Sequence, residues 1–215
     1  MIYFISDLHG NKNFKGLQEY LSIATDNDLL IILGDLCLNF EPTEENRSFT
    51  EYFLSLDKHI AFLDGNHENF PYINSFPEEI WNGGKVHRLS KHLVHLERGE
   101  IYTLEGRTFF TFGGCKSSAK WAQMGLWYLG EQGTEKEFQY ACDNLRKHGN
   151  SVDYILTHKY EDNPAAINIC VEPINLTDYL ENHITYREWY FGHSHRIKTL
   201  NGNHFCIYDE LTPLI

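Results

Sequence analysis

The sequence lacks the patterns that mark secreted, disulfide-stabilised and membrane-spanning proteins. It has no CxxC pair, and an odd number of cysteines cannot all pair within one chain; the five are Cys37, Cys115, Cys142, Cys170 and Cys206. The N-terminus turns polar at Ser6, too early for the apolar region of a signal peptide, and no uninterrupted apolar run approaches the length of a membrane span. We therefore expect a cytoplasmic protein with reduced thiols and no membrane association.

Basic residues are also scarce. The chain has 18 Lys and Arg against 30 Asp and Glu, which gives a formal net charge of -12. Such a charge opposes non-specific attachment to polynucleotides and to anionic membrane surfaces. We therefore expect no stable nucleic-acid binding, and a phosphate-bearing substrate must be attracted by a local positive charge.

No linker rich in Pro, Gly or Ser, no internal repeat and no low-complexity segment divides the chain. Its 215 residues are near the usual size of one compact domain, and 42% hydrophobic residues with 14% aromatics can bury a full core. The sequence therefore predicts a single domain over residues 1–215.

Apolar segments rich in β-forming residues alternate with segments of helical period. We predict strands at residues 2–5, 29–33, 60–63, 109–112, 154–156 and 189–191. Apolar residues with helical spacing lie within 14–24, 49–56 and 138–145, and the third helix has a capping-box pattern at Thr134 and Glu137. Residues 86–112 resemble an antiparallel meander, and the end of the chain resembles a hairpin through Asn201 and Gly202. Together these patterns predict an α/β fold with a mixed two-layer core and helices outside it.

Side chains that can bind metals follow five of the predicted strands, at the carboxyl ends where open α/β sheets bind ligands. They are Asp7 and His9, then Asp35, then Asn66 and His67, then His158, and finally His193 and His195. Any one of them is more often a hydrogen-bonded structural residue than a ligand, but five successive strand ends favour a shared site. Setting His67 aside, the set offers two carboxylates, one amide oxygen and four imidazoles, which suit manganese, iron or zinc better than calcium. The absence of Cys from the set argues against a purely structural zinc site.

These motifs resemble the signature of the calcineurin-like metallophosphoesterases. The matching segments are Asp7 to His9, Gly34 with Asp35, the GNHE of Gly65 to Glu68, Thr157 with His158, and the GHSH of Gly192 to His195. The resemblance spans nearly the whole chain. It implies a metallophosphoesterase-like four-layer sandwich, in which two mixed β-sheets pack face to face and helices flank both.

The resemblance also implies two divalent metal ions, manganese in the first place, with iron, zinc, nickel or cobalt as alternatives. One ion would be held by Asp7, His9, Asp35 and His195, and the other by Asp35, Asn66, His158 and His193, so that Asp35 bridges them. Two such ions bring a charge of about +4, of which the two aspartates and a bridging hydroxide remove about three. The local excess would attract phosphate into an otherwise acidic protein.

The implied activity is hydrolysis of a phosphomonoester or small phosphorylated metabolite by the hydroxide that bridges the metals. His67 would face the substrate and assist the departing oxygen, and Glu68 would orient His67. Asp35 and His67 are therefore the predicted catalytic residues. The protein phosphatases of the same family place a second aspartate and an arginine after the GD motif, but here Asp35 is followed by Leu36 and Cys37.

Two other functions remain open. The same ligands would serve a phosphodiesterase that acts on a cyclic or dinucleotide substrate, because only the pocket decides what fits. A scaffold without catalysis is the third reading, although no predicted ligand is missing. Residues 113–133, with Trp121 and Lys120, could form a loop facing the substrate, and Asn11 and Arg196 also follow the motifs closely enough to touch it.

Overall fold

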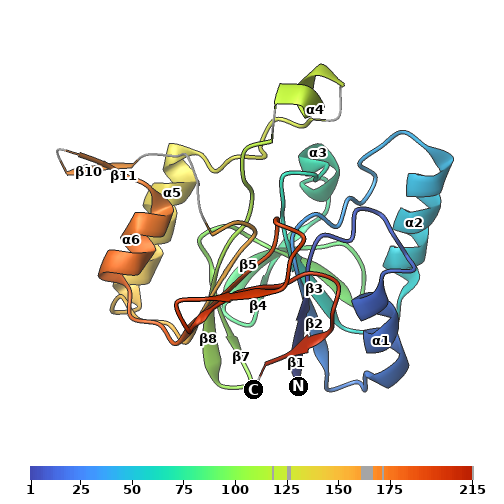
Figure 1. Ribbon diagram of the computed structural model, residues 1–215, viewed down its shortest axis with the longest axis horizontal. Coiled ribbons are helices and arrows are strands. Elements are labelled where there is room, and N and C mark those ends of the chain that lie inside the picture. The colour runs from blue at the N-terminus through green and yellow to red at the C-terminus, as the bar shows by residue number, and fades with distance from the viewer. Residues whose placement is uncertain (118, 125–126, 161–166, 171, 215) are drawn as a thin grey trace.

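The computed structural model describes residues 1–117, 119–124, 127–160, 167–170 and 172–214. Two large β-sheets lie at its centre, and helices cover the outer face of each (Figure 1). In that view α1 and α2 lie to the right of the sheets and α5 and α6 to the left. This is the α/β arrangement of two mixed sheets flanked by helices that the sequence predicts.

The first sheet contains seven strands in the order β15-β1-β2-β3-β6-β5-β4. Its strands are β1 (Ile2–Ile5), β2 (Leu29–Leu33), β3 (Ile60–Leu63), β4 (Glu78–Trp81), β5 (Gly84–Arg88), β6 (Leu93–Leu96) and β15 (Thr212–Pro213). The four strands β1, β2, β3 and β6 are parallel to their neighbours in this series, so their carboxyl ends lie at one edge.

The second sheet contains six strands in the order β13-β14-β12-β9-β8-β7. Its strands are β7 (Ile101–Leu104), β8 (Arg107–Phe112), β9 (Tyr154–Thr157), β12 (Glu188–Phe191), β13 (Lys198–Leu200) and β14 (His204–Cys206). The strands β8, β9, β12 and β14 are again parallel. A separate antiparallel pair, β10 (Ile167–Cys170) and β11 (Glu172–Ile174), stands apart from both sheets.

Six helices connect these strands in the part of the chain that the structure describes. They are α1 (Lys15–Ile23), α2 (Glu44–Ser55), α3 (Phe70–Ile73), α4 (Ala119–Gln123), α5 (Glu135–Lys147) and α6 (Leu176–His183). The capping box predicted for α5 is present: the Thr134 hydroxyl accepts from the Glu137 backbone N–H, and the Glu137 carboxylate accepts from that of Thr134. None of the helices within the described residues is long and apolar enough to cross a membrane.

Successive side chains point to opposite faces of each strand, and this alternation produces three hydrophobic layers. In β1, Phe4 points between the two sheets, whereas Ile5 packs beneath α1 and α2. In β8, Phe109 likewise faces the space between the sheets, while Phe110 packs under α5 and α6. Both faces of β1 and β8 are therefore apolar, and the polar residues next to them lie at the strand ends.

One predicted connection is wrong. Residues 86–112 do not form a single meander, because β5 pairs with β6 in the first sheet and β7 pairs with β8 in the second. The chain crosses between the sheets at Glu97 to Glu100, and Gly99 takes a left-handed φ of 79° in this crossing. The predicted terminal hairpin is present as β13 and β14, with left-handed Asn201 and Gly202 at its turn.

Candidate metal centre

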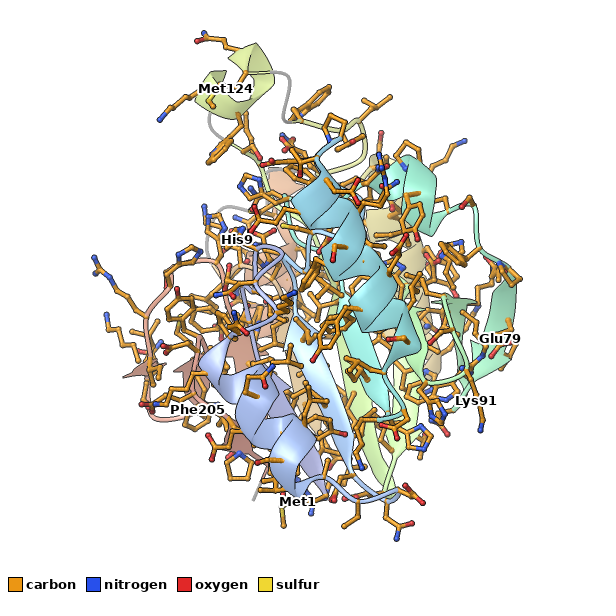
Figure 2. The ribbon with its side chains drawn as sticks, turned by 90° about the vertical axis from the view of Figure 1, so that its right-hand side faces the viewer. Met1, His9, Glu79, Lys91, Met124 and Phe205 are labelled. Atoms are coloured by element: carbon orange, nitrogen blue, oxygen red, sulfur yellow. The ribbon has the colours of Figure 1, made fainter. Side chains whose placement is uncertain are left out.

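The carboxyl ends of six parallel strands, three from each sheet, converge at one end of the molecule. The first sheet brings the segments that follow β1, β2 and β3, and the second brings those that follow β8, β9 and β12. His9 lies at this end, far from Met1 at the start of β1 (Figure 2). All seven predicted metal ligands and His67 lie here, together with one residue that the sequence reasoning did not select, Cys115.

Three of the strand ends share an unusual backbone path. The residues that carry their functional side chains have left-handed φ angles: Asp7 61° and His9 48°, Asp35 54° and Cys37 65°, His193 66° and His195 50°. Such values are uncommon outside glycine, although Asp, Asn and His tolerate them best. Each pair therefore lies in a strained turn beyond the strand. Strain of this kind is stored where function requires a fixed geometry.

Two glycines allow the strand ends to approach one another. A Cβ atom on Gly65 would lie 2.0 Å from the Asp35 Oδ1 atom, and one on Gly192 would lie 1.8 Å from the Ser6 Oγ atom. Neither glycine has a left-handed φ angle. Their role is therefore close packing of one strand end against another, and not the sharp turn that their place in the motifs suggests.

A first group of ligand atoms joins β1, β2 and β12. The Nε2 atoms of His9 and His195 face each other at 3.0 Å. Asp7 Oδ1 lies 3.4 Å from His195 Nε2, and Asp35 Oδ2 lies 3.7 Å from His9 Nε2. Because Asp7 Oδ1 is buried and has no hydrogen-bond partner, this group contains an oxygen that only a cation or a proton would satisfy.

A second group joins β2, β3, β9 and β12. His158 Nε2 lies 3.2 Å from Asn66 Oδ1, 3.2 Å from His193 Nδ1 and 3.6 Å from Asp35 Oδ1. The other ring nitrogen of His158 is 2.7 Å from the Leu33 carbonyl oxygen, which fixes Nδ1 as the donor. The Nε2 lone pair of His158 therefore points into the group, as a metal ligand requires.

Asp35 connects the two groups. Its Oδ2 atom faces His9 in the first group, and its Oδ1 atom faces His158 in the second. Oδ1 also accepts the backbone N–H of His67 at 2.8 Å, so the carboxylate cannot rotate freely. The donor set and the unpartnered Asp7 oxygen fit a pair of divalent cations that share Asp35.

The pKa shifts of the imidazoles also support a metal site. Burial, together with the nearby His158, lowers the pKa of His193 to about 4, and burial lowers the pKa of His9. Both shifts favour the neutral form of the ring, which is the form that binds a metal. Burial opposes charge on His158, but Asp35 raises its pKa well above the usual value, and the Asp7 carboxylate, 3.4 Å from the His195 ring, raises the pKa of His195. The two carboxylates therefore demand a compensating positive charge at this position.

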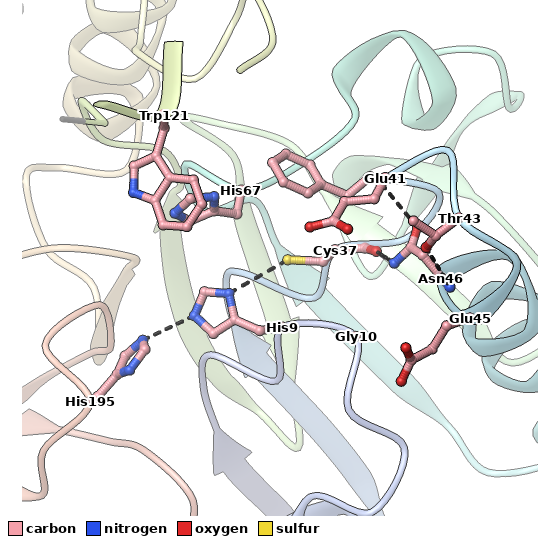
Figure 3. A pocket seen from close by; sticks show the side chains of 11 residues that line it. His9, Gly10, Cys37, Glu41, Thr43, Glu45, Asn46, His67, Trp121 and His195 are labelled. Atoms are coloured by element: carbon pink, nitrogen blue, oxygen red, sulfur yellow. Dashed lines mark hydrogen bonds between the residues drawn. The ribbon is translucent and has the colours of Figure 1, made fainter. Parts of the chain in front are cut away.

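His67 lies on the open side of the centre, in the wall of a cavity of about 470 Å³ (Figure 3). Its ring packs edge-on against Trp121 of α4, with ring centroids 4.7 Å apart, and against Phe40 at 5.5 Å. His9 and His195 line the same cavity, so a molecule held there would touch both the first ligand group and His67. Trp121, which belongs to the predicted substrate-facing loop of residues 113–133, lines this cavity.

Glu68 has a different position from the one expected. Its carboxylate accepts the backbone N–H groups of Leu36 at 2.8 Å and Cys37 at 3.1 Å. Burial and the neighbouring Asp35 raise its pKa well above the usual value, whereas these two hydrogen bonds act in the opposite direction. Glu68 therefore fixes the turn that carries Asp35, whereas we predicted that it would orient His67.

Cys115 is the functional candidate that sequence reasoning missed. Its buried Sγ atom lies 3.1 Å from Asn66 Oδ1 and 3.5 Å from His193 Nδ1, within the second ligand group. The signal was its place three residues after the strand that ends at Phe112, directly after Gly113 and Gly114. Nearby, the Ser117 hydroxyl accepts from the Asn66 amide at 2.9 Å, which directs the amide oxygen toward His158.

A second, basic cavity adjoins His193 on the side of β13. It has a volume of about 240 Å³ and is lined by three cationic side chains, Lys159, Arg196 and Lys198. Arg196 thus lies beside the centre, as its position after the GHSH motif suggests. Asn11 lines neither of these two cavities, but it lines another one, of about 340 Å³, together with Asp7 and His9, and it accepts the Asn13 backbone N–H.

Comparison with known proteins identifies one family. The model of the calcineurin-like phosphoesterase family matches residues 1–197. No curated protein sequence matches the chain. Among solved structures, the chain is similar to the crystal structure of phosphopantetheinyl hydrolase (PptH) from Mycobacterium tuberculosis, with 15% identity, a TM-score of 0.41, and coverage of 96% of this chain and 89% of that one.

Proposed function

Since the chain belongs to the calcineurin-like phosphoesterase family, we propose that it hydrolyses a phosphomonoester of a small metabolite at the centre described above. One divalent cation would be held by Asp7, His9, Asp35 and His195, and the other by Asp35, Asn66, His158 and His193. When bound, the two cations supply a water of lowered pKa as the nucleophile and polarise the phosphoryl oxygens. Manganese is the cation that we propose first.

The observation that carries this proposal is the position of Asp35. Its two oxygens face two different groups of ligands, at 3.7 Å from His9 Nε2 and 3.6 Å from His158 Nε2. A carboxylate that formed only a structural ion pair would need only one imidazole as its partner. An Asp35 that is shared between two imidazole clusters is instead suited to bridge two cations and to set their separation.

The remaining residues of the cavity suit a small leaving group. Phe40 and Trp121 provide apolar walls on either side of His67, and the cavity of about 470 Å³ has the size of a site for a small ligand. His67 is placed to donate a proton to the oxygen that leaves, or to stabilise charge on it. Glu41 and Glu45 also line this cavity, so the attraction for phosphate must come from the cations and not from these side chains.

A second candidate function, hydrolysis of a cyclic or dinucleotide phosphodiester, is favoured by the basic cavity. Lys159, Arg196 and Lys198 line this cavity together with His193, whereas His67 lines the other cavity. A substrate that carries a second phosphate could place it among these cations while its scissile phosphate lies at the centre. A monoester of a small alcohol would leave this cavity unused.

The two functions are separated by assaying manganese-loaded protein on nitrophenyl phosphate and on bis-nitrophenyl phosphate, and then on a panel of nucleotides. We expect kcat/KM for the monoester to exceed that for the diester by at least about tenfold. The opposite preference, with rapid turnover of a cyclic or dinucleotide substrate, would replace the first function by the second.

We also propose that Cys115 is a ligand of the second cation. In cobalt-loaded protein a thiolate ligand gives a strong charge-transfer absorption in the near ultraviolet, and Cys115→Ser should lose this band while keeping its bound cobalt. Cys142→Ala is the control, because Cys142 is buried in α5 among apolar side chains. A band that persists in Cys115→Ser would place the thiol beside the cation and not on it.

A further inference from the structure

A second group of metal-binding side chains lies on the outer face of the first sheet, apart from the phosphoesterase centre. His87 on β5 and His95 on β6 are paired directly across the two antiparallel strands. Val86, Val94 and Leu96 point into the core between the sheets, so the two histidines point the opposite way. Glu97, two residues beyond His95, extends on the same face as the histidines, and all three offer ligand atoms within 4.8 Å of one another.

These side chains present atoms that lack ordinary partners. The Nδ1 atoms of His87 and His95 and the Oε1 atom of Glu97 are buried, and none of them makes a hydrogen bond. His87 Nδ1 and Glu97 Oε1 are in contact with each other as an ion pair. This ion pair provides no partner for His95 Nδ1. His95 is only 4% exposed, so water does not readily replace the missing partner. A buried nitrogen without a partner is costly, and a cation shared by the three side chains would give His95 Nδ1 a partner.

The other nitrogen of His95 is held as in a metal-binding histidine. His95 Nε2 lies 3.2 Å from Asp64 Oδ1, and Asp64 in turn accepts from Arg98 Nη2 at 2.6 Å and Nε at 2.9 Å. Since Arg98 keeps Asp64 paired as a carboxylate, the proton of the His95 ring belongs on Nε2. The lone pair then lies on Nδ1, which is left free to bind a cation. A carboxylate that orients a histidine in this way is a recurrent support of metal sites.

We propose that His87, His95 and Glu97 bind a divalent transition metal ion, with zinc as the preferred ion. Two imidazoles and one carboxylate are a zinc donor set, and a water can complete the tetrahedron. The ligand atoms are buried, but the side chains of His87 and Glu97 are 12% and 27% exposed, so the group lies close to the surface. The ion would clamp β5 to β6 and, through His95, hold Asp64 next to Gly65 of the GNHE motif. This site does not depend on the proposed function.

Zinc content tests the proposal. Chelator-treated wild-type protein is dialysed against zinc, and bound zinc per chain is measured for wild type, Glu97→Gln, His87→Ala and, as the control, His183→Ala, which alters an exposed histidine of α6. Both site variants should hold one equivalent less than wild type, and the control should match wild type. Equal zinc in all four proteins, or the same loss in the control, would overturn the proposal.

Diffraction from zinc-loaded crystals provides the second measurement. Anomalous scattering at the zinc edge should give a peak between His87 and His95 in the wild-type protein, whether or not the variants fold. Absence of that peak would overturn the site. The test compares the zinc content of the variants with that of wild type, so a loss of one equivalent is informative even if the phosphoesterase centre holds no ion. Asp35→Asn, in contrast, reports on the phosphoesterase centre alone.

Discussion

Asp35→Asn should abolish hydrolysis and empty both ligand groups of the phosphoesterase centre. An amide offers one oxygen and no charge, so it cannot serve His9 and His158 together. Loss of residues that only support a ligand typically lowers metal affinity or activity by about 10- to 100-fold, and loss of the shared ligand itself should cost more. The measurement is manganese bound per chain together with the steady-state rate on a phosphomonoester.

Two further variants make this result specific. His158→Ala should empty mainly the second group, since His158 contacts Asn66 and His193 there. Asp26→Asn is the matched control, because Asp26 is exposed and precedes β2 at its amino end, opposite to the centre. Near-complete metal occupancy in Asp35→Asn would show that Asp35 does not bridge.

His67→Ala should keep both metals and lower the rate by about 10²- to 10⁴-fold, the usual cost of losing a general acid. The reason is that none of the proposed ligands has changed, whereas the ring that faces the cavity has gone. The loss should be far larger for an alkyl phosphate than for a nitrophenyl phosphate. An alkoxide is strongly basic and needs a proton as it leaves, but nitrophenolate is a stable anion that hardly does.

The control for this variant is His59→Ala, which alters an exposed histidine at the amino end of the same strand, β3. An equal loss on the alkyl and nitrophenyl substrates would exclude proton donation and leave His67 as an electrostatic clamp on the phosphoryl group. Loss of metal from His67→Ala would make it a structural support of the centre.

The convergence of strand ends was predictable because it follows from hydrophobic patterning alone. Strands such as Leu29–Leu33 are buried on both faces, so Asp35 is among the first residues that can be polar. The left-handed turns at Asp7 and His193 were not predictable, because they result from packing between distant strand ends. Backbone bonds such as Asp7 N–H to the Gly34 carbonyl hold these turns, and no local pattern in the sequence reports them.

Two other features could not be predicted from the sequence, for different reasons. Cys115 belongs to no motif, and its place beside His193 depends on the pairing of β8 with β9. The pairing of His87 with His95 depends on the register of a hairpin inside a segment that we assigned as one continuous meander. Short-range patterns predict elements, but the sheet that a strand joins is decided by packing between layers.

Metal dependence is the central claim, and activity as a function of bound manganese tests it most directly. Protein stripped with a chelator should release no phosphate from a monoester, and activity should return as manganese refills the ligands around Asp35. Full turnover by the metal-free protein would contradict the account.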